Sequence, residues 1–441
     1  MSVRKIQENP TKAILRFSVP SIMAMLLETV ITVTDGYFTG NYVGENALAA
    51  INLGLPILYV YLGVGLCVGV GGTVICGGLL GAGDGRRASE VFSQTMITAA
   101  GVCLLTSLAV ALLFAPILRA LGADGALSAC FTDYYGIMLF TYPLMVAGTV
   151  LGMFIRVDGK PQACMMVSVA ACLLNIVLDG ILVGRLGLGV KGSALASLAV
   201  QAMAVLAQGV YFIRPSRGIR FRRHRFDRAV NRETILNGSS EMIGEMAGAV
   251  SMYAFNYVLM KHAGAEGVAS FTILSFAVYG YSMVVIGFGQ GMTALVSVCW
   301  GAQEWSTAMA LRRLTNRILF GIGALLAVGF AVLGRRYAGL FGRSEAVGEM
   351  VASGFRFYAV AFLIMGYDVI NSMYFTSCGD ALYSAVISAL RGVVLLLAFI
   401  MIFPAIWGMA GVWMAAPATE ALTAVVSGFL IERQKKVIGG R

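Results

Sequence analysis

Two carboxylates lie in stretches of this sequence that are long enough and apolar enough to cross a membrane. Asp35 lies near the end of the apolar stretch 13–35, and Asp179 lies within the stretch 163–183. A carboxylate in the hydrocarbon region costs about 2.5–3.5 kcal/mol on insertion scales, so it persists only where it faces a cavity, a partner or a bound ion. Both acids are therefore candidate functional residues. One alternative stays open, that Asp35 ends a helix at the water interface before Gly36.

The spacing around Asp179 adds a second polar group. Asn175 precedes Asp179 by one helical turn, so both side chains project from the same helix face. If Asp35 approaches this face from its own helix, two carboxylates in a low-dielectric cavity cannot both be ionised cheaply. Either one keeps a proton or a cation is bound between them, and both outcomes make a coupling-ion site. The simpler interpretation is that Asp179 only hydrogen bonds to a neighbouring helix.

Composition determines the class of protein. The chain has 441 residues, of which 59% are hydrophobic and 12% charged, and this excludes a soluble domain with a single core. We predict an all-α integral membrane protein with twelve spans, each long enough to cross roughly 30 Å of hydrocarbon. The predicted spans are 13–35, 48–79, 91–118, 134–155, 163–183, 193–213, 234–260, 268–300, 314–333, 351–377, 381–402 and 410–431.

Basic residues are unevenly shared between the loops. A cytoplasmic N-terminus places 21 Lys and Arg residues on the cytoplasmic side and seven on the other side. The positive-inside rule then places both termini in the cytoplasm. We expect a multi-pass protein of the bacterial inner (plasma) membrane. The loop 214–233 carries eight arginines. We expect it to meet anionic membrane lipid rather than nucleic acid, because no nucleic-acid-binding module accompanies it.

The same loop separates two halves that repeat. A shift of 220 positions, with one later slip of a residue, aligns glycines of the two halves. The aligned pairs include Gly44 with Gly264, Gly159 with Gly379 and, after the slip, Gly189 with Gly408. We therefore predict an N-lobe at 1–213, a basic cytoplasmic linker at 214–233 and a C-lobe at 234–441. Because each half has six spans, the two lobes are expected to be parallel, which is a transporter architecture.

Three segments carry a family resemblance. They are YVGENALAAINLGLPI (42–57), RVDGKP (156–161) and NIVLDGILVGRLGLGVKGSALASLAVQ (175–201). Together with Pro20 and Asp35, they resemble the multidrug and toxic compound extrusion (MATE) transporters, and the MepA-like branch most of all. The resemblance covers nearly the whole chain.

This resemblance implies a two-lobed antiporter that expels lipophilic organic cations in exchange for H⁺ or Na⁺. Asp35, Asn175 and Asp179 match the family's N-lobe cation or proton site. Ser197 stands where some relatives carry a Thr hydroxyl at that site, and Tyr134 or its neighbour Tyr135 could approach it. No other metal and no organic cofactor is expected; the only metal considered is Na⁺ between the two aspartates.

Pro20 is a candidate hinge, because proline removes a backbone hydrogen bond and permits the first helix to bend. We hypothesise that protonation of either aspartate changes this bend and shrinks the drug cavity of the N-lobe.

The second half does not repeat the acids Asp35 and Asp179 of the first half. The 220-residue shift places Asp35 on Phe255 and Asp179 on Phe399, so the ion site is not duplicated. The second half has other membrane acids, namely Glu241, Glu245, Asp368 and Glu420. Relatives of the NorM branch are similar in using acids on their seventh and tenth helices. Two interpretations stay open: these acids attract a cationic substrate, or they pair with Arg356 and Arg391.

The predicted substrate cavity combines acids with soft apolar side chains, which favours lipophilic cations of varied shape. Glu28 and Met246 are candidates for this cavity, beside the acids Glu241, Glu245 and Asp368. Methionine is also an ordinary filler of helix interfaces, so Met246 alone carries little weight.

Two other functions remain as alternatives. A flippase for lipid-linked saccharides would need more cationic residues around its cavity, and a receptor or channel would not need a buried acid pair. An enzyme is not expected, because no Ser/His/Asp or metal-ligand cluster is recognisable. We expect small organic cations and membrane lipid as partners, and a monomer.

Overall fold

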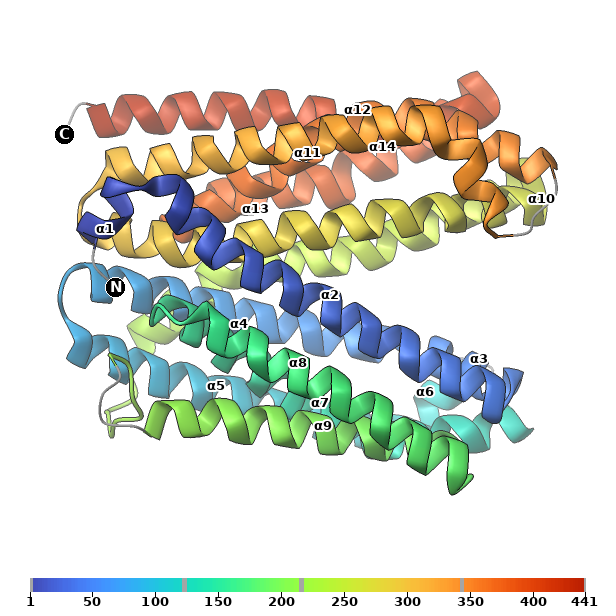
Figure 1. Ribbon diagram of the computed structural model, residues 1–441, viewed down its shortest axis with the longest axis horizontal. Coiled ribbons are helices and arrows are strands. Elements are labelled where there is room, and N and C mark those ends of the chain that lie inside the picture. Colours follow the sequence, from blue (N-terminus) through green and yellow to red (C-terminus); the bar gives the residue numbers. More distant parts are fainter. Residues whose placement is uncertain (1–2, 121–124, 214–217, 342–344, 440–441) are drawn as a thin grey trace. The chain divides into compact units, whose positions relative to one another are not determined.

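The computed structural model describes residues 3–120, 125–213, 218–341 and 345–439, and almost all of them are helical (Figure 1). The first four residues of the predicted basic linker, 214–217, lie outside the described residues. The helices of the first half are α1 (Val3–Glu8), α2 (Pro10–Tyr42), α3 (Glu45–Leu53), α4 (Leu55–Gly81), α5 (Gly85–Leu112), α6 (Phe114–Ala120), α7 (Gly125–Val157), α8 (Pro161–Asp179), the π-helix η1 (Gly180–Arg185) and α9 (Gly189–Ile213). Those of the second half are α10 (Arg228–Gly301), α11 (Trp305–Gly339), α12 (Glu345–Ser377), α13 (Ala381–Ala389), the π-helix η2 (Leu390–Val394) and α14 (Leu395–Gly439).

Ten helical stretches of the described chain are long and apolar enough to cross a membrane, and two of them contain two spans each. The 74-residue α10 is interrupted at Gly264, where φ is 58°, and the 58-residue stretch Ala381–Ile438 is interrupted at Gly408, where φ is 56°. Glycine tolerates positive φ because it has no Cβ, so it can reverse the chain between two spans. Division at these glycines gives twelve spans, and the predicted all-α membrane fold is confirmed.

The described chain forms two compact units. The first comprises Val19–Gly238, and the second comprises the residues up to Ser18 together with those from Ser239 onward. Both divisions fall inside long helices, α2 and α10. The predicted limits at 213 and 234 follow the loop instead, and they stay a prediction.

The backbone itself repeats between the units. Helix α7 runs from 125 to 157 and α12 from 345 to 377, so both ends are offset by 220 residues. Positive φ recurs at the same offset, at Gly44 (112°) and Gly264 (58°) and again at Gly159 (90°) and Gly379 (79°). The predicted glycine pairs therefore mark equivalent bends, which is why a glycine stands at each of them.

Glycines in α4 permit close helix packing in the first unit. A Cβ at Gly72 would lie 2.2 Å from the Thr95 hydroxyl oxygen of α5, and one at Gly71 would lie 1.9 Å from the Thr234 carbonyl oxygen. The sequence GVGLCVGVGG therefore serves packing, as expected for small residues between membrane helices.

Candidate functional site

Three helices of the first unit meet at Asp35. Asn175 of α8 donates a hydrogen bond from Nδ2 to Asp35 Oδ1 at 2.8 Å, and Ser197 of α9 donates to Asp35 Oδ2 at 3.4 Å. Helices α8 and α9 pack against each other (Figure 1). One side chain from each of them reaches Asp35 of α2. The structure thus brings together three residues that are up to 162 positions apart in the sequence.

Asp179 lies beside this group and is fully buried. No donor in the described part of the chain reaches either of its carboxyl oxygens. The neighbouring carboxyl is that of Asp35, within hydrogen-bonding reach. Two carboxylates can hydrogen bond to each other only when one of them carries a proton, so this pair either shares a proton or binds a cation.

Tyr134 of α7 completes the site. It is 6% exposed and interacts electrostatically with both Asp35 and Asp179. Tyr135 turns elsewhere, since its hydroxyl donates to the Ile51 carbonyl oxygen at 2.7 Å. Of the two tyrosines considered from the sequence, Tyr134 is therefore the one at the site.

Within the described residues, no cation acts on the pair. Asp35 interacts with Asp179, Asn175, Ser197 and Tyr134, and Asp179 interacts with Asp35 and Tyr134. None of these side chains is cationic. A buried carboxyl without a fixed counter-charge must take its positive charge from an exchangeable species. The arrangement can therefore bind H⁺ or a small cation and release it again.

Local backbone structure shapes the site in two ways. Helix α2 continues seven residues past Asp35 to Tyr42, so the alternative that Asp35 ends a helix is wrong. Directly after Asp179 the α-helix widens into the π-helix η1, Gly180–Arg185. Single turns of π-helix are common at functional sites, because they rotate the side chains that follow.

Two hydroxyls near the site were not recognised from the sequence. Thr39 follows Asp35 by one helical turn, and Ser193 precedes Ser197 by one turn. Both side chains are fully buried, and neither hydroxyl has a hydrogen-bond partner among the described residues. The i, i+4 spacing to a predicted site residue was the available signal.

The sequence profile of the MatE family matches residues 20–181 and 242–426 of this chain. The chain belongs to the MatE family. Among curated relatives, the multidrug export protein MepA of Staphylococcus aureus (strain MRSA252) is 24% identical over 426 residues, which is 95% of this chain and 93% of MepA. The predicted family and its MepA-like branch are confirmed.

Solved MATE structures share the fold. A MATE crystal structure in complex with MaL6 superposes with a TM-score of 0.93 at 21% identity, covering 100% of this chain and 99% of the other. An outward-facing multidrug resistance MATE transporter of the MOP superfamily gives 0.92 at 22% identity, covering 98% and 97%. The twelve-helix fold is therefore that of the MatE transporters.

Pro20 and Glu28 of this MatE protein lie on α2, before the site. Pro20 is buried within a continuous helix, two residues after the division between the units. Glu28 lies two helical turns before Asp35, is accessible, and interacts electrostatically with Arg156. Neither residue belongs to the group around Asp35.

The second unit holds a different acidic cluster. Arg391 donates from Nε to both carboxyl oxygens of Glu420, at 2.9 and 3.0 Å. Asp368 is fully buried, accepts a hydrogen bond from Ser427 at 3.1 Å, and lies close to Glu420 and Arg391. Of the pairings considered from the sequence, the one with Arg391 is formed by Glu420, whereas Arg356 is exposed and forms no ion pair with the described residues.

Glu241 and Glu245 of α10 lie one helical turn apart and influence each other electrostatically. The Thr376 hydroxyl donates to Glu241 at 3.5 Å and lies 2.6 Å from the Ser384 hydroxyl oxygen. Met246 is 48% exposed on the same helix.

The positions equivalent to the two N-lobe aspartates hold aromatic stacks. Phe255 stacks on Phe271 with ring centroids 4.7 Å apart, and Phe399 stacks on Phe403 at the same distance. Apolar rings therefore stand at the positions equivalent to Asp35 and Asp179, and the second unit does not repeat this acid pair there.

Proposed function

We propose that this protein is a cation-coupled multidrug efflux antiporter that exports lipophilic organic cations in exchange for H⁺ or Na⁺. One observation carries the proposal: the half-buried carboxyl of Asp35 and the fully buried carboxyl of Asp179 form a pair with no fixed cation among the described residues. Such a pair is stable only when it holds an exchangeable positive charge.

Coupling follows from competition for this negative charge. A proton or Na⁺ on the pair neutralises the field that attracts a cationic drug, so each ligand weakens the binding of the other by the same factor. Two six-helix lobes that alternate their access would then carry the ion and the drug in opposite directions. This chemistry needs no resident metal or organic cofactor.

The relatives support the choice of substrate. The S. aureus relative is named a multidrug export protein, and one of the solved relatives is named a multidrug resistance transporter. Lipophilic cations suit an acid pair bordered by aromatic and aliphatic groups, because the carboxylate supplies attraction while the apolar surface adapts to shape. Tyr134 is the buried aromatic group beside both carboxyls.

Pro20 is the proposed hinge of α2. It lies where the helix passes from one unit into the other, and proline leaves the helix without one backbone hydrogen bond. Protonation of the aspartates then changes the bend of α2 and the size of the cavity. Pro20→Ala should lower the rate of efflux without abolishing drug binding, and an unaltered efflux rate would count against the hinge.

The proposed setting is the bacterial plasma membrane, with both termini in the cytoplasm and a monomer as the functional unit. The unequal division of Lys and Arg between the loops supports this orientation. Proteolysis of a C-terminal tag in right-side-out vesicles tests it, because a cytoplasmic tag is protected there.

The test of function is ethidium efflux from energised vesicles under separately imposed proton and sodium gradients. We expect gradient-driven efflux in the wild type and its loss in Asp35→Asn and Asp179→Asn. Asp133→Asn is the matched control, because it removes only an exposed ion pair with Lys191, 3.1 Å long. The gradient that drives efflux identifies the coupling ion.

Other outcomes of this experiment would favour one of the alternative functions. Efflux that proceeds at the same rate with and without either gradient would indicate a channel-like protein. The absence of ethidium transport in the wild type, together with movement of a lipid-linked saccharide, would indicate a flippase. Full efflux in both aspartate variants would remove the N-lobe pair from the coupling site.

A further inference from the structure

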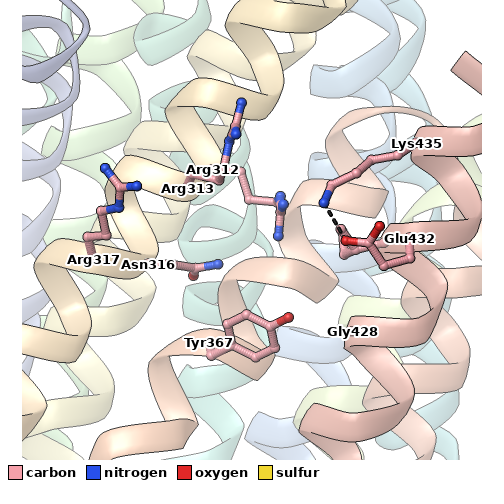
Figure 2. Close-up of a pocket in the computed structure, with 9 residues that line it drawn as sticks. Arg312, Arg313, Asn316, Arg317, Tyr367, Gly428, Glu432 and Lys435 are labelled. Carbon is pink, nitrogen blue, oxygen red and sulfur yellow. Dashed lines mark hydrogen bonds and ion pairs between the residues drawn. The ribbon is translucent and has the colours of Figure 1, made fainter. Parts of the chain in front are cut away.

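A cavity of about 440 Å³ lies in the second unit. Helix α12 packs against both α11 and α14, and all three helices line the cavity. Figure 2 shows three arginines on α11, Tyr367 on α12, and Glu432 with Lys435 on α14. The volume is within the range of small-molecule binding sites, roughly 300–1,000 Å³.

Arg312 is the buried cation of this cavity, with only 4% of its surface exposed. One guanidinium nitrogen, Nη1, donates to Asn371 Oδ1 at 2.8 Å, and the guanidinium carbon lies 5.3 Å from the centre of the Tyr374 ring. Its Nε has no hydrogen-bond partner among the described residues. A buried charged donor without a partner is costly, so this group is poised for a ligand.

The charge around the cavity is unbalanced. Arg313 and Arg317 lie one turn apart on α11, and like charges at this spacing repel each other. No carboxylate in the described part of the chain forms an ion pair with any of the three arginines. The single acid that lines the cavity, Glu432, is paired with Lys435.

The equivalent place in the first unit is filled. A shift of 220 residues carries Arg312 back to Phe92 of α5, which is fully buried. Phe92 contacts three other rings with centroid distances of 4.5–4.9 Å, namely Phe154, Phe212 and Phe221. Aromatic packing therefore fills the position of Phe92 in the first unit, whereas the equivalent position in the second unit, Arg312, lines an open cavity with other cations.

We propose that this cavity binds a phosphate group. Guanidinium groups donate paired hydrogen bonds to phosphate oxygens, and the cavity presents one buried and two exposed guanidinium groups. A bound phosphate would supply the unpartnered Arg312 Nε with an acceptor and would neutralise the repulsion between Arg313 and Arg317.

Two sources of phosphate fit this chemistry, namely the headgroup of an anionic phospholipid and a soluble phosphate. The predicted span 314–333 begins directly after Arg313, so the cavity lies at the level of lipid headgroups. Phe320 on α11 and Phe429 on α14 are 57% and 67% exposed, next to the residues that line the cavity. These apolar side chains can contact acyl chains, and basic pockets at this level bind anionic lipids in other membrane proteins.

The experiment measures the thermal unfolding midpoint of the purified full-length protein in detergent. One arm titrates sodium phosphate against sodium chloride at equal ionic strength, and the other titrates dihexanoyl phosphatidylglycerol against dihexanoyl phosphatidylcholine. Binding to the folded state raises the midpoint as ligand concentration increases. Stabilisation by both phosphate and phosphatidylglycerol identifies the phosphate group as sufficient, and stabilisation by phosphatidylglycerol alone identifies a lipid site.

Variants assign the effect to the cavity. The double variant Arg313→Gln/Arg317→Gln changes two exposed residues, so the fold is retained, and it should weaken the apparent affinity at least about tenfold. Arg336→Gln, at the other exposed end of α11, is the matched control and should bind like the wild type. The proposal is overturned if neither ligand stabilises the wild type, if phosphatidylcholine acts as strongly as phosphatidylglycerol, or if the double variant keeps wild-type affinity.

Discussion

The two units of this protein have the same backbone pattern but give their buried acids opposite surroundings. In the first unit, Asp35 and Asp179 face each other. Asp35 accepts from one amide and one hydroxyl, and no donor among the described residues reaches Asp179. In the second unit, Glu420 is held by Arg391 through two hydrogen bonds, and Asp368 lies beside that ion pair.

This difference separates exchangeable charge from permanent charge. An arginine cannot leave the protein and does not lose its proton, so Glu420 is neutralised throughout a transport cycle. The N-lobe pair has no such partner in the described chain, and it must take its positive charge from solution. We therefore propose that ion exchange occurs in the first unit and that the Arg391–Glu420 pair has a structural role.

A fixed cation in the first unit should have the largest effect. Ser197→Lys places an ammonium group beside Asp35 and imitates the arrangement of Arg391 and Glu420. We expect gradient-driven ethidium efflux to fall to background, while the protein still folds and inserts. The control Ser197→Ala removes only the 3.4 Å hydrogen bond and should retain most of the efflux. Normal efflux by Ser197→Lys would show that the pair tolerates a permanent charge and does not couple.

Removal of the fixed cation from the second unit should affect stability. Arg391→Met leaves Glu420, whose side chain is 10% exposed, without its partner. We expect a loss of about 2–4 kcal/mol in the free energy of unfolding, less than for a fully buried pair because Arg391 is 30% exposed. Chemical unfolding in detergent measures this loss. The double variant Arg391→Met/Glu420→Gln should recover more than half of it, and an equal loss in both variants would contradict the assignment.

Variants that remove one hydrogen bond to an acid should change ion affinity in the first unit but not in the second. Asn175→Ala removes the donor to Asp35 Oδ1, which stabilises the ionised carboxylate, and should strengthen proton binding at the site by about tenfold, since a hydrogen bond to a charged group contributes about 1.5–3 kcal/mol. Ser427→Ala removes the donor to Asp368 and should leave that affinity unchanged. The ion concentration that gives half-maximal efflux rate measures both. The reverse ranking would move the ion site to the second unit.

The smallest effect is expected at an exposed ion pair of the first unit. Asp133→Asn breaks the contact with Lys191, whose side chain is 56% exposed. Exposed ion pairs contribute about 0–1 kcal/mol, so unfolding free energy and efflux should both remain near wild type. A large loss of efflux in this variant would mean that charge removal anywhere in the unit impairs transport. The loss of efflux in Asp35→Asn and Asp179→Asn would then not identify the ion site.

Much of the fold could be predicted because its signals are local. Apolar length gives the spans, and the glycines that interrupt α10 and α14 stand at predicted repeat positions, Gly264 and Gly408. Asn175 and Asp179 could be predicted to share a face because helical geometry places i and i+4 together.

The remaining features depend on contacts that local patterns do not contain. The continuation of α2 past Asp35 is possible because Gly36 stays in helical conformation, although glycine alone suggested a stop. The pairing of Arg391 with Glu420 and the hydrogen bond from Arg312 to Asn371 join residues that are 29 and 59 positions apart, beyond the reach of any local pattern. In the sequence, Arg312 and Arg313 served only as basic residues in the prediction of membrane orientation.

The most direct test of the account is the affinity of the purified protein for ethidium, measured by fluorescence over a range of pH and sodium concentration. We predict that H⁺ or Na⁺ weakens ethidium binding in the wild type, because the ion and the drug compete for the Asp35–Asp179 charge. This dependence should disappear in Asp179→Asn and persist in Asp368→Asn. Its persistence in Asp179→Asn together with its loss in Asp368→Asn would place the exchangeable charge in the second unit and contradict the account.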